Sequence, residues 1–208
     1  MQDILYDAAA EFYKLKDVKY RVKLGRKRNT YDFILHFPPE SFFHLAGLQH
    51  LTDIVFPSTN KERIFKEILE HNITIEYLKK SIYYESEKVE ERITNLYLLE
   101  KILEDNKVAY KINPKELVKY SSIVADYLME YKDSDTYYLF IVKERYNPQF
   151  DGEHKGRSFF KKDRVDYTTG TSKCTLLLMH KIYNFGTEQQ NEIEIFRNPS
   201  YKPEFDEQ

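Results

Sequence analysis

Histidine, basic and aromatic residues are the ones in this chain that could carry out a reaction together. Metal-free cleavage of RNA needs a group that takes the ribose 2′-hydroxyl proton, a second that protonates the leaving 5′-oxygen, and a cation that stabilises the phosphorane. Histidine suits proton transfer because its pKa lies near neutrality. Arg or Lys suits the cation, and Tyr or Phe can stack on unpaired bases. Five histidines are the candidate proton carriers: His36, His44, His50, His154 and His180.

Other kinds of site are not indicated by the sequence. It contains neither a glycine-rich phosphate loop nor a Gly-x-Ser-x-Gly elbow. Cys174 is the single cysteine, so neither an internal disulfide nor a thiolate metal cluster can form. His44 and His50 are six residues apart, which corresponds to about 240° around one continuous helix. We therefore expect no metal ion to bind on one helix face, and no cofactor.

The stretch Tyr31–Leu51 combines apolar and polar residues most densely. Its first part alternates in the manner of a strand with one buried face, and Pro38-Pro39 ends that strand. Ser41 is a plausible N-cap for a short helix from Phe42 to about Thr52. Polar groups packed among apolar residues need hydrogen-bond partners, or they have a functional role. In this helix they are His44, Gln49, His50 and Asp53.

A basic hairpin is predicted before this stretch. Val18–Leu24 alternates as a strand, and the turn Gly25–Asn29 leads into the strand that begins at Tyr31. The outward side is strongly basic and includes Arg26 and Lys27. Two interpretations remain open. Lysines blunt the exposed edges of sheets, and basic clusters also bind phosphate groups.

The remaining pattern predicts an α+β fold. Thr59–Asn106 is helical with mixed surface charge, so we expect an insertion at about 59–119 that packs on one face of a sheet and carries no chemistry. Ser122–Tyr131, Thr136–Arg145 and Ser172–Ile182 alternate as strands. The expected sheet is antiparallel, with about five to six strands and a short helix before it. Residues 1–187 would form one domain, followed by an acidic, partly ordered tail over 188–208.

Asp126 lies on a largely apolar strand face in this prediction. A carboxylate is costly there unless it is paired. It needs a structural partner, such as Arg145 or a backbone amide, or it has a catalytic role.

Four segments, in order, resemble those of a bacterial and phage-associated family. They are SFFHLAGLQHLTD (Ser41–Asp53), YSSIVADYLMEY (Tyr120–Tyr131), YYLFIVKE (Tyr137–Glu144) and SFF (Ser158–Phe160). The family is the fourth group of predicted nucleases related to barnase, EndoU, the tRNA-cleaving colicins and RelE. Each segment is mostly hydrophobic and weakly specific alone, so the resemblance depends on their order.

The resemblance implies where a site would lie. Relatives in the wider superfamily place a short helix before a curved antiparallel sheet and act from its open face without a metal. The matching positions here are His44, Gly47 and Leu48 in the helix motif, with Asp126 and Ser158 in the strand motifs. His44 would then be the general base or acid, Arg157 would bind phosphate, and Ser158 would contribute a hydroxyl. The residues expected to contact substrate are His50, Arg26, Lys27, Asp126, Thr175 and Lys181.

Two functions follow as hypotheses. The first is a metal-independent endoribonuclease, toxin-like or mobile-element associated, acting on RNA such as tRNA. It predicts that His44, Arg157 and Ser158 converge in a basic cleft. The second is a non-catalytic accessory module that binds RNA or a host protein. It predicts a flat aromatic patch, with His44 hydrogen-bonded into the core.

Composition and charge limit the classes of partner that this protein is expected to bind. The net charge of -2 argues against indiscriminate binding of nucleic acid through overall charge. No apolar run approaches the ~20 residues of a membrane span. The N-terminal segment reads as an amphipathic helix with acidic residues and not as a signal peptide. We expect a cytoplasmic protein with no membrane partner, and with RNA and a protein inhibitor as candidate partners. The sequence indicates no oligomeric state.

Overall fold

The computed structural model describes residues 3–106, 108–117, 119, 121–144 and 152–202. Its strands are β1 (Val18–Arg26), β2 (Asn29–His36), β3 (Val108–Lys111), β4 (Tyr127–Lys132), β5 (Thr136–Lys143), β6 (Glu153–Lys161), β7 (Ser172–Tyr183) and β8 (Asn191–Arg197). Its helices are α1 (Ile4–Tyr13), α2 (Ser41–Leu45), the 3-10 turn η1 (Leu48–His50), α3 (Lys61–Leu69), α4 (Ile75–Leu78), α5 (Val89–Asn95), α6 (Leu98–Asp105) and α7 (Pro114–Leu117). None of the described helices has the length and apolar content that a membrane crossing requires.

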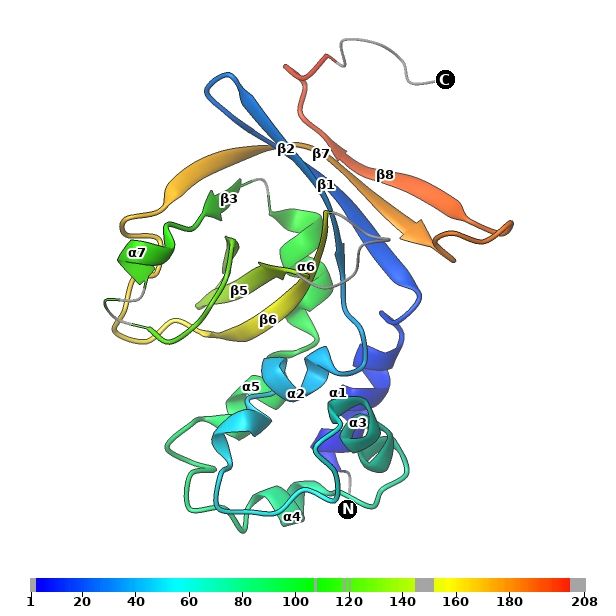
Figure 1. The fold of residues 1–208 in the computed structure, drawn as a ribbon, viewed down its shortest axis with the longest axis vertical. Coiled ribbons are helices and arrows are strands. Elements are labelled where there is room, and N and C mark those ends of the chain that lie inside the picture. The colour runs from blue at the N-terminus through cyan, green and yellow to red at the C-terminus, as the bar shows by residue number, and fades with distance from the viewer. Residues whose placement is uncertain (1–2, 107, 118, 120, 145–151, 203–208) are drawn as a thin grey trace.

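Seven strands form a closed barrel. They follow the order β1-β2-β6-β5-β4-β3-β7, and β7 pairs with β1 to close the ring. The pairing of β2 with β6 is parallel, from Ile34 opposite Glu153 to His36 opposite Lys155, while the other described pairings are antiparallel. β8 adds to the outside of the ring by pairing with β7 (Figure 1).

The predicted α+β arrangement, an antiparallel sheet of about five to six strands with a helical insertion on one face, is therefore wrong. The sheet has eight strands, closes on itself and contains a parallel pair. Alternation along a strand shows that it has a buried face but not which strand lies beside it. The short β3 and the charged β8 also lacked a recognisable pattern, and β8 lies in the segment expected to be a partly ordered tail.

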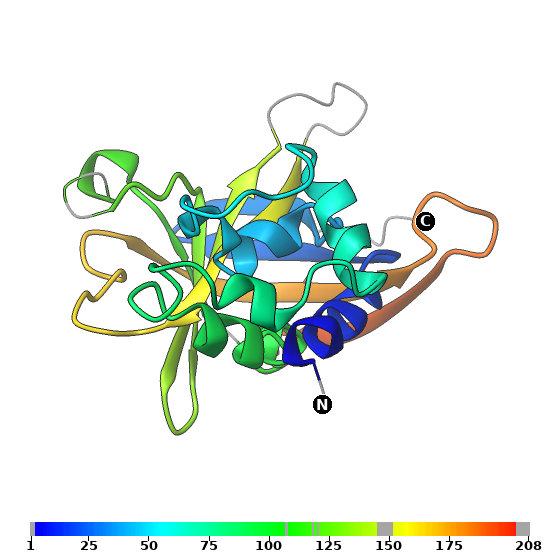
Figure 2. The same ribbon diagram turned by 90° about the horizontal axis from the view of Figure 1, so that it is seen from below.

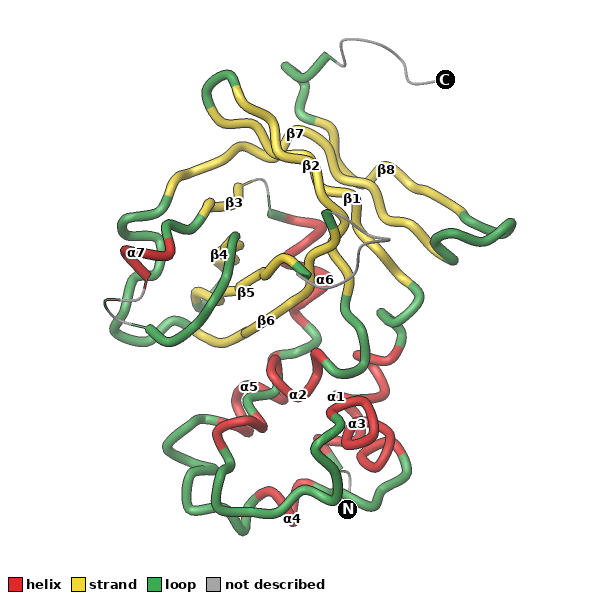
Figure 3. Tube along the Cα trace, in the orientation of Figure 1, coloured by secondary structure: helices red, strands yellow, loops and turns green. Residues whose placement is uncertain are grey.

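Helices α1 to α5 gather at one end of the barrel, whereas α6 and α7 lie beside the strands (Figure 3). A view from below places α1 to α5 in front of the strands (Figure 2). Asp3 caps α1 by accepting a hydrogen bond from the Leu5 amide at 3.0 Å. Phe12 of α1 packs against Phe42 of α2 and Phe65 of α3, with ring centroids 5.5 and 5.9 Å apart. This aromatic cluster continues into the barrel interior.

β4 and β5 bury both of their faces. Leu139 and Ile141 pack in the main core, whereas Tyr138 and Phe140 belong to a second cluster with Leu117 of α7. Strands covered on both sides read as continuous apolar runs, which explains the sequence YYLFIV in β5. The second cluster extends to Phe160 and Tyr167, and so reaches the pocket described below.

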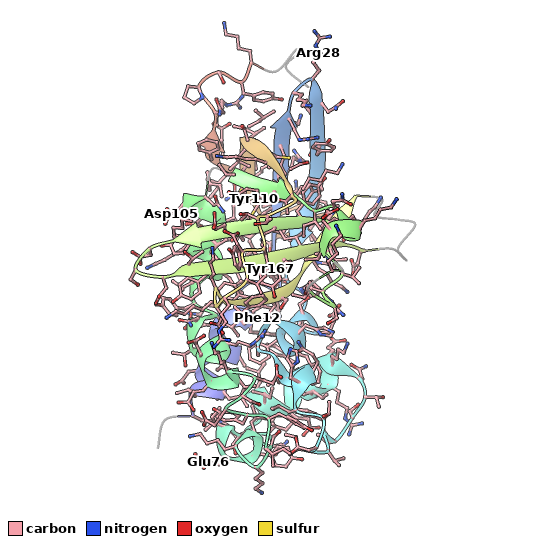
Figure 4. All side chains as sticks on the ribbon, turned by 90° about the vertical axis from the view of Figure 1, so that its left-hand side faces the viewer. Phe12, Arg28, Glu76, Asp105, Tyr110 and Tyr167 are labelled. Carbon is pink, nitrogen blue, oxygen red and sulfur yellow. The ribbon has the colours of Figure 1, made fainter. Side chains whose placement is uncertain are left out.

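The molecule is elongated. Arg28, at the tip of the β1–β2 hairpin, and Glu76, in α4, lie at its opposite ends (Figure 4). Tyr167 lies between them, on the barrel wall.

Candidate functional site

A pocket of about 530 Å³ lies where α2, η1 and α5 meet β6. Its walls include His44, His50, Arg92, Arg157 and Ser158. Three of these were expected to act together, and the structure brings His44, Arg157 and Ser158 into this one pocket.

A break in the predicted helix places both histidines at the pocket. The single helix expected from Phe42 to about Thr52 is interrupted by Gly47, whose φ of 77° is left-handed. α2 therefore ends before Gly47, and η1 starts in a new direction. His44 and His50 both line the pocket, an arrangement that the continuous helix would not have allowed.

A β-bulge accounts for the neighbouring residues Arg157 and Ser158. Ser158 pairs with Phe140, and Gly156 pairs with the next residue of β5, Ile141, so Arg157 is the extra residue on β6. Successive side chains of a regular strand point to opposite faces, but a bulge changes their direction. Both side chains line the pocket as a result.

Gly156 lets α2 approach this part of β6 closely. A Cβ atom at Gly156 would lie 2.8 Å from the Phe37 ring and 3.3 Å from Leu45 of α2. The glycine therefore holds α2, and with it His44, against the bulged strand.

His44 lies between two cations. Its Nε2 is 2.6 Å from Lys61 Nζ and 3.0 Å from Arg157 Nη1. Burial, followed by the charges of Arg157, Lys61 and Lys155, lowers the pKa of His44 to about 3. The ring is thus neutral at pH 7, and its Nε2 lone pair accepts hydrogen bonds. Neither Lys61 nor Arg157 is ion-paired with a carboxylate among the residues that the structure describes.

His50 is held by two neighbours. Its Nε2 lies 2.9 Å from Gln49 Nε2, and its Nδ1 lies 3.3 Å from Glu87 Oε2. Burial and the positive charge of Arg92 lower the pKa of His50, partly opposed by Glu87. A neutral His50 whose Nδ1–H faces the Glu87 carboxylate accepts at Nε2 from the Gln49 amide.

The other residues expected to contact substrate do not line the pocket. Arg26 and Lys27 lie beside Arg28 at the far tip of the hairpin. Thr175 is exposed on β7, and Lys181 binds Glu100 and Glu104 of α6, at 3.0 Å each. Asp126 accepts a 2.7 Å hydrogen bond from the Lys143 backbone amide, the second of the partners considered for it. Arg145 lies outside the described residues.

Sequence reasoning missed Lys61 and Arg92. Both come from the helical block that was expected to carry no chemistry. Lys61 begins α3 after the N-cap Asn60, and Arg92 lies in α5 among residues of mixed charge. Neither has a local signal that separates it from a solvated surface residue.

A second polar cluster could hold a metal ion. The ligand atoms of His36, Glu144 and Glu153 all lie within 4.8 Å of one another. Both carboxylates are already paired, Glu153 with Lys19 at 2.5 Å and Glu144 with Lys155 at 2.8 Å. The cluster is therefore an ion-pair network across the parallel β2–β6 join, and its charges are compensated without a metal.

Cations that face a neutral histidine at the edge of a pocket form a candidate anion-binding site with an acid–base group. The chain belongs to the family described as phage-Barnase-EndoU-ColicinE5/D-RelE like nuclease 4, which it matches over residues 4–195. The predicted family is thus confirmed. Membership supports a nuclease function with a nucleic acid as substrate and an association with phages. No match was found among curated proteins or among solved structures.

Proposed function

We propose that this protein is a metal-independent endoribonuclease that cleaves RNA by transesterification, with tRNA among its candidate substrates. The observation that carries the proposal is the placement of His44 Nε2 between Lys61 Nζ and Arg157 Nη1 beside the pocket. A phosphodiester that binds these two cations lies next to the one neutral acceptor between them.

The reaction assigns one role to each group. His44 Nε2 takes the proton of the ribose 2′-hydroxyl, and the 2′-oxygen forms a bond to phosphorus. Arg157 stabilises the charge that develops on the phosphorane oxygens, and the Ser158 hydroxyl donates a further hydrogen bond to them. Lys61 Nζ gives a proton to the 5′-oxygen as the P–O5′ bond breaks. The products are a 2′,3′-cyclic phosphate and a 5′-hydroxyl.

Substrate binding would adjust these groups for proton transfer. The charges of Arg157 and Lys61 help to hold down the pKa of His44. A bound phosphate anion offsets them, so it raises the basicity of His44 at the step that needs a base. The pKa of Lys61 is lowered by burial and by the charges of Arg157 and Lys155, which makes its ammonium a stronger acid.

The test is cleavage of total tRNA and of a generic single-stranded RNA in EDTA by wild type, His44→Ala and Lys61→Met. We expect wild type to produce cyclic-phosphate ends and each variant to lose about 100-fold or more in rate, the usual contribution of an acid or base. His71→Asn is the matched control, because His71 stacks on Tyr6 outside the pocket and Asn tolerates its φ of 59°.

Two other outcomes would count against the proposal. Cutting that survives His44→Ala in a folded protein overturns the assigned site. Purified wild type that binds RNA but cuts neither substrate favours the accessory module, which binds RNA or a host protein without catalysis.

A further inference from the structure

Two buried polar atoms in the wall of the pocket have no hydrogen-bond partner among the described residues. They are Gln49 Oε1 and Arg92 Nη1, and both side chains line the pocket. Buried donors and acceptors are normally paired, so each such atom calls for an explanation. One is an acceptor and the other a donor, and they belong to two side chains of the same pocket wall.

Three contacts hold the Arg92 side chain in place, and Nη1 remains without a hydrogen-bond partner among the described residues. Its Nε donates to the Glu87 carbonyl oxygen at 3.2 Å. Its guanidinium lies 5.0 Å above the centre of the Phe160 ring. Its stem fills the space beside Gly47, where a Cβ would come within 2.6 Å of Arg92 Cδ. The guanidinium is thus oriented before any ligand binds.

Gln49 is oriented by His50. The Gln49 amide nitrogen donates to His50 Nε2 at 2.9 Å, since Nδ1 of the same ring faces Glu87. This network leaves the amide oxygen of Gln49 as the free acceptor.

The rest of the wall at this end carries charges of both signs. Glu87, Glu91 and Asp163 line the pocket together with Lys88, Arg92 and Lys161, and Lys88 pairs with Asp163 at 3.0 Å. These charges offset one another, so this end offers no excess of positive charge for a second phosphate. Phe160 and Tyr167 add apolar surface, with ring centroids 5.6 Å apart. A neutral, planar ligand with both donors and acceptors on its edge fits such a wall.

We infer that this end of the pocket binds one unpaired nucleobase of the RNA, with Arg92 donating to the edge of the base and Gln49 accepting from it. The inference rests on the proposed function, which places the adjoining phosphate at Lys61 and Arg157. A volume of about 530 Å³ leaves room for one nucleotide.

Binding of single nucleotides tests the inference without any cleavage. The probes are AMP, GMP, CMP and UMP, with ribose 5-phosphate as the matched ligand that lacks a base, titrated into labelled protein by NMR. We expect at least one nucleotide to bind about tenfold more tightly than ribose 5-phosphate, the factor typical of base stacking and edge contacts. The pocket residues should shift with it.

Variants separate base contacts from phosphate contacts. Arg92→Gln and Gln49→Met should lower the affinity for the preferred nucleotide about tenfold and leave that for ribose 5-phosphate unchanged. Arg63→Gln is the control, because Arg63 is exposed on α3 and pairs only with Glu67 at 3.7 Å among the described residues. Arg92→Lys replaces Arg92→Gln if the latter does not fold.

The two proposals can fail separately. Equal binding of ribose 5-phosphate and all four nucleotides overturns the base site, even if cleavage depends on His44. Loss of ribose 5-phosphate binding in Arg92→Gln would make Arg92 a phosphate ligand and also overturn it. A base-dependent affinity in a protein that cuts no RNA leaves the base site standing and removes the nuclease.

Discussion

His44 combines a low pKa with two cationic neighbours, and this combination predicts the pH dependence of cleavage. A general base works while it is deprotonated. The acid limb of the pH profile of kcat/KM should therefore lie well below pH 6.5, towards pH 3, because the pKa of His44 in the substrate-free protein is about 3. A general acid works while it is protonated, so the basic limb should follow Lys61, whose pKa is lowered from 10.5. Rate profiles of wild type and Lys61→Met check this: the variant should lose the basic limb. A basic limb that persists in Lys61→Met would exclude Lys61 as the acid.

The same pKa predicts an effect on stability that needs no substrate. Unfolded His44 protonates near pH 6.5, whereas folded His44 does so only near pH 3. Between these values the unfolded state binds more protons, so the free energy of unfolding falls as the pH falls. His44→Gln should therefore lose less stability than wild type between about pH 7 and about pH 5, as measured by urea unfolding. Equal losses would show that the ring is not held neutral.

At the residue scale, the sequence could predict part of the candidate site. His44, Arg157 and Ser158 came from short motifs and their resemblance to a family, and the structure gathers them in one pocket. Lys61 and Arg92 could not be found in this way, because a lysine after an N-cap and an arginine among glutamates are ordinary surface patterns. Only the three-dimensional packing brings them to His44 and Gly47.

At the scale of secondary structure, Gly47 links the helix break to Arg92 and gives a matched test. Gly47 and Gly186 have the same φ of 77°, but a Cβ would meet Arg92 at Gly47 and nothing within 4 Å at Gly186. Gly186→Ala should cost only the left-handed backbone strain, about 1–2 kcal/mol. Gly47→Ala should cost more, and it should also weaken nucleotide binding by displacing Arg92. Urea unfolding measures both costs, and equal values would show that Arg92 moves aside freely.

The elements differ in how far their sequence defines them. The strands around Val18–Leu24 and Ser172–Ile182 were placed well, since alternation is a local signal. The helix after Ser41 was predicted as one piece because apolar spacing continues across Gly47, where a left-handed φ of 77° separates α2 from η1. The bulge at Arg157 follows from pairing with β5 and has no local mark.

At the scale of the whole molecule, a largely buried ion pair links β1 to β6 beside the parallel pairing of β2 with β6. Lys19 and Glu153 lie 2.5 Å apart, and their side chains are 18% and 6% exposed. Glu153→Gln removes the carboxylate that pairs with the Lys19 ammonium at 2.5 Å, and breaking a pair this little exposed should cost about 3–5 kcal/mol in the free energy of unfolding. Glu11→Gln is the control, because the Lys14–Glu11 pair is exposed and should contribute little. Similar costs for the two variants would show that the join does not depend on this pair.

Barrel closure could not be read from the sequence. It depends on β7 pairing with β1, and on a parallel contact between β2 and a strand far along the chain. Hydrophobic alternation is the same whether a sheet is open or closed, so it could not show how the strands join, and the α+β prediction was wrong for this reason.

The pairing of β1 with β7 also affects how this protein folds during its synthesis. β1 is made before its partner β7, and residues 27–171 are made between the two strands. Synthesis proceeds at about 5–20 residues per second, so β1 spends many seconds with one edge unpaired. Exposed strand edges recruit other chains. We therefore expect nascent copies of this protein to be prone to aggregation until β7 has been made, and chaperones that shield strand edges to raise its yield at that stage.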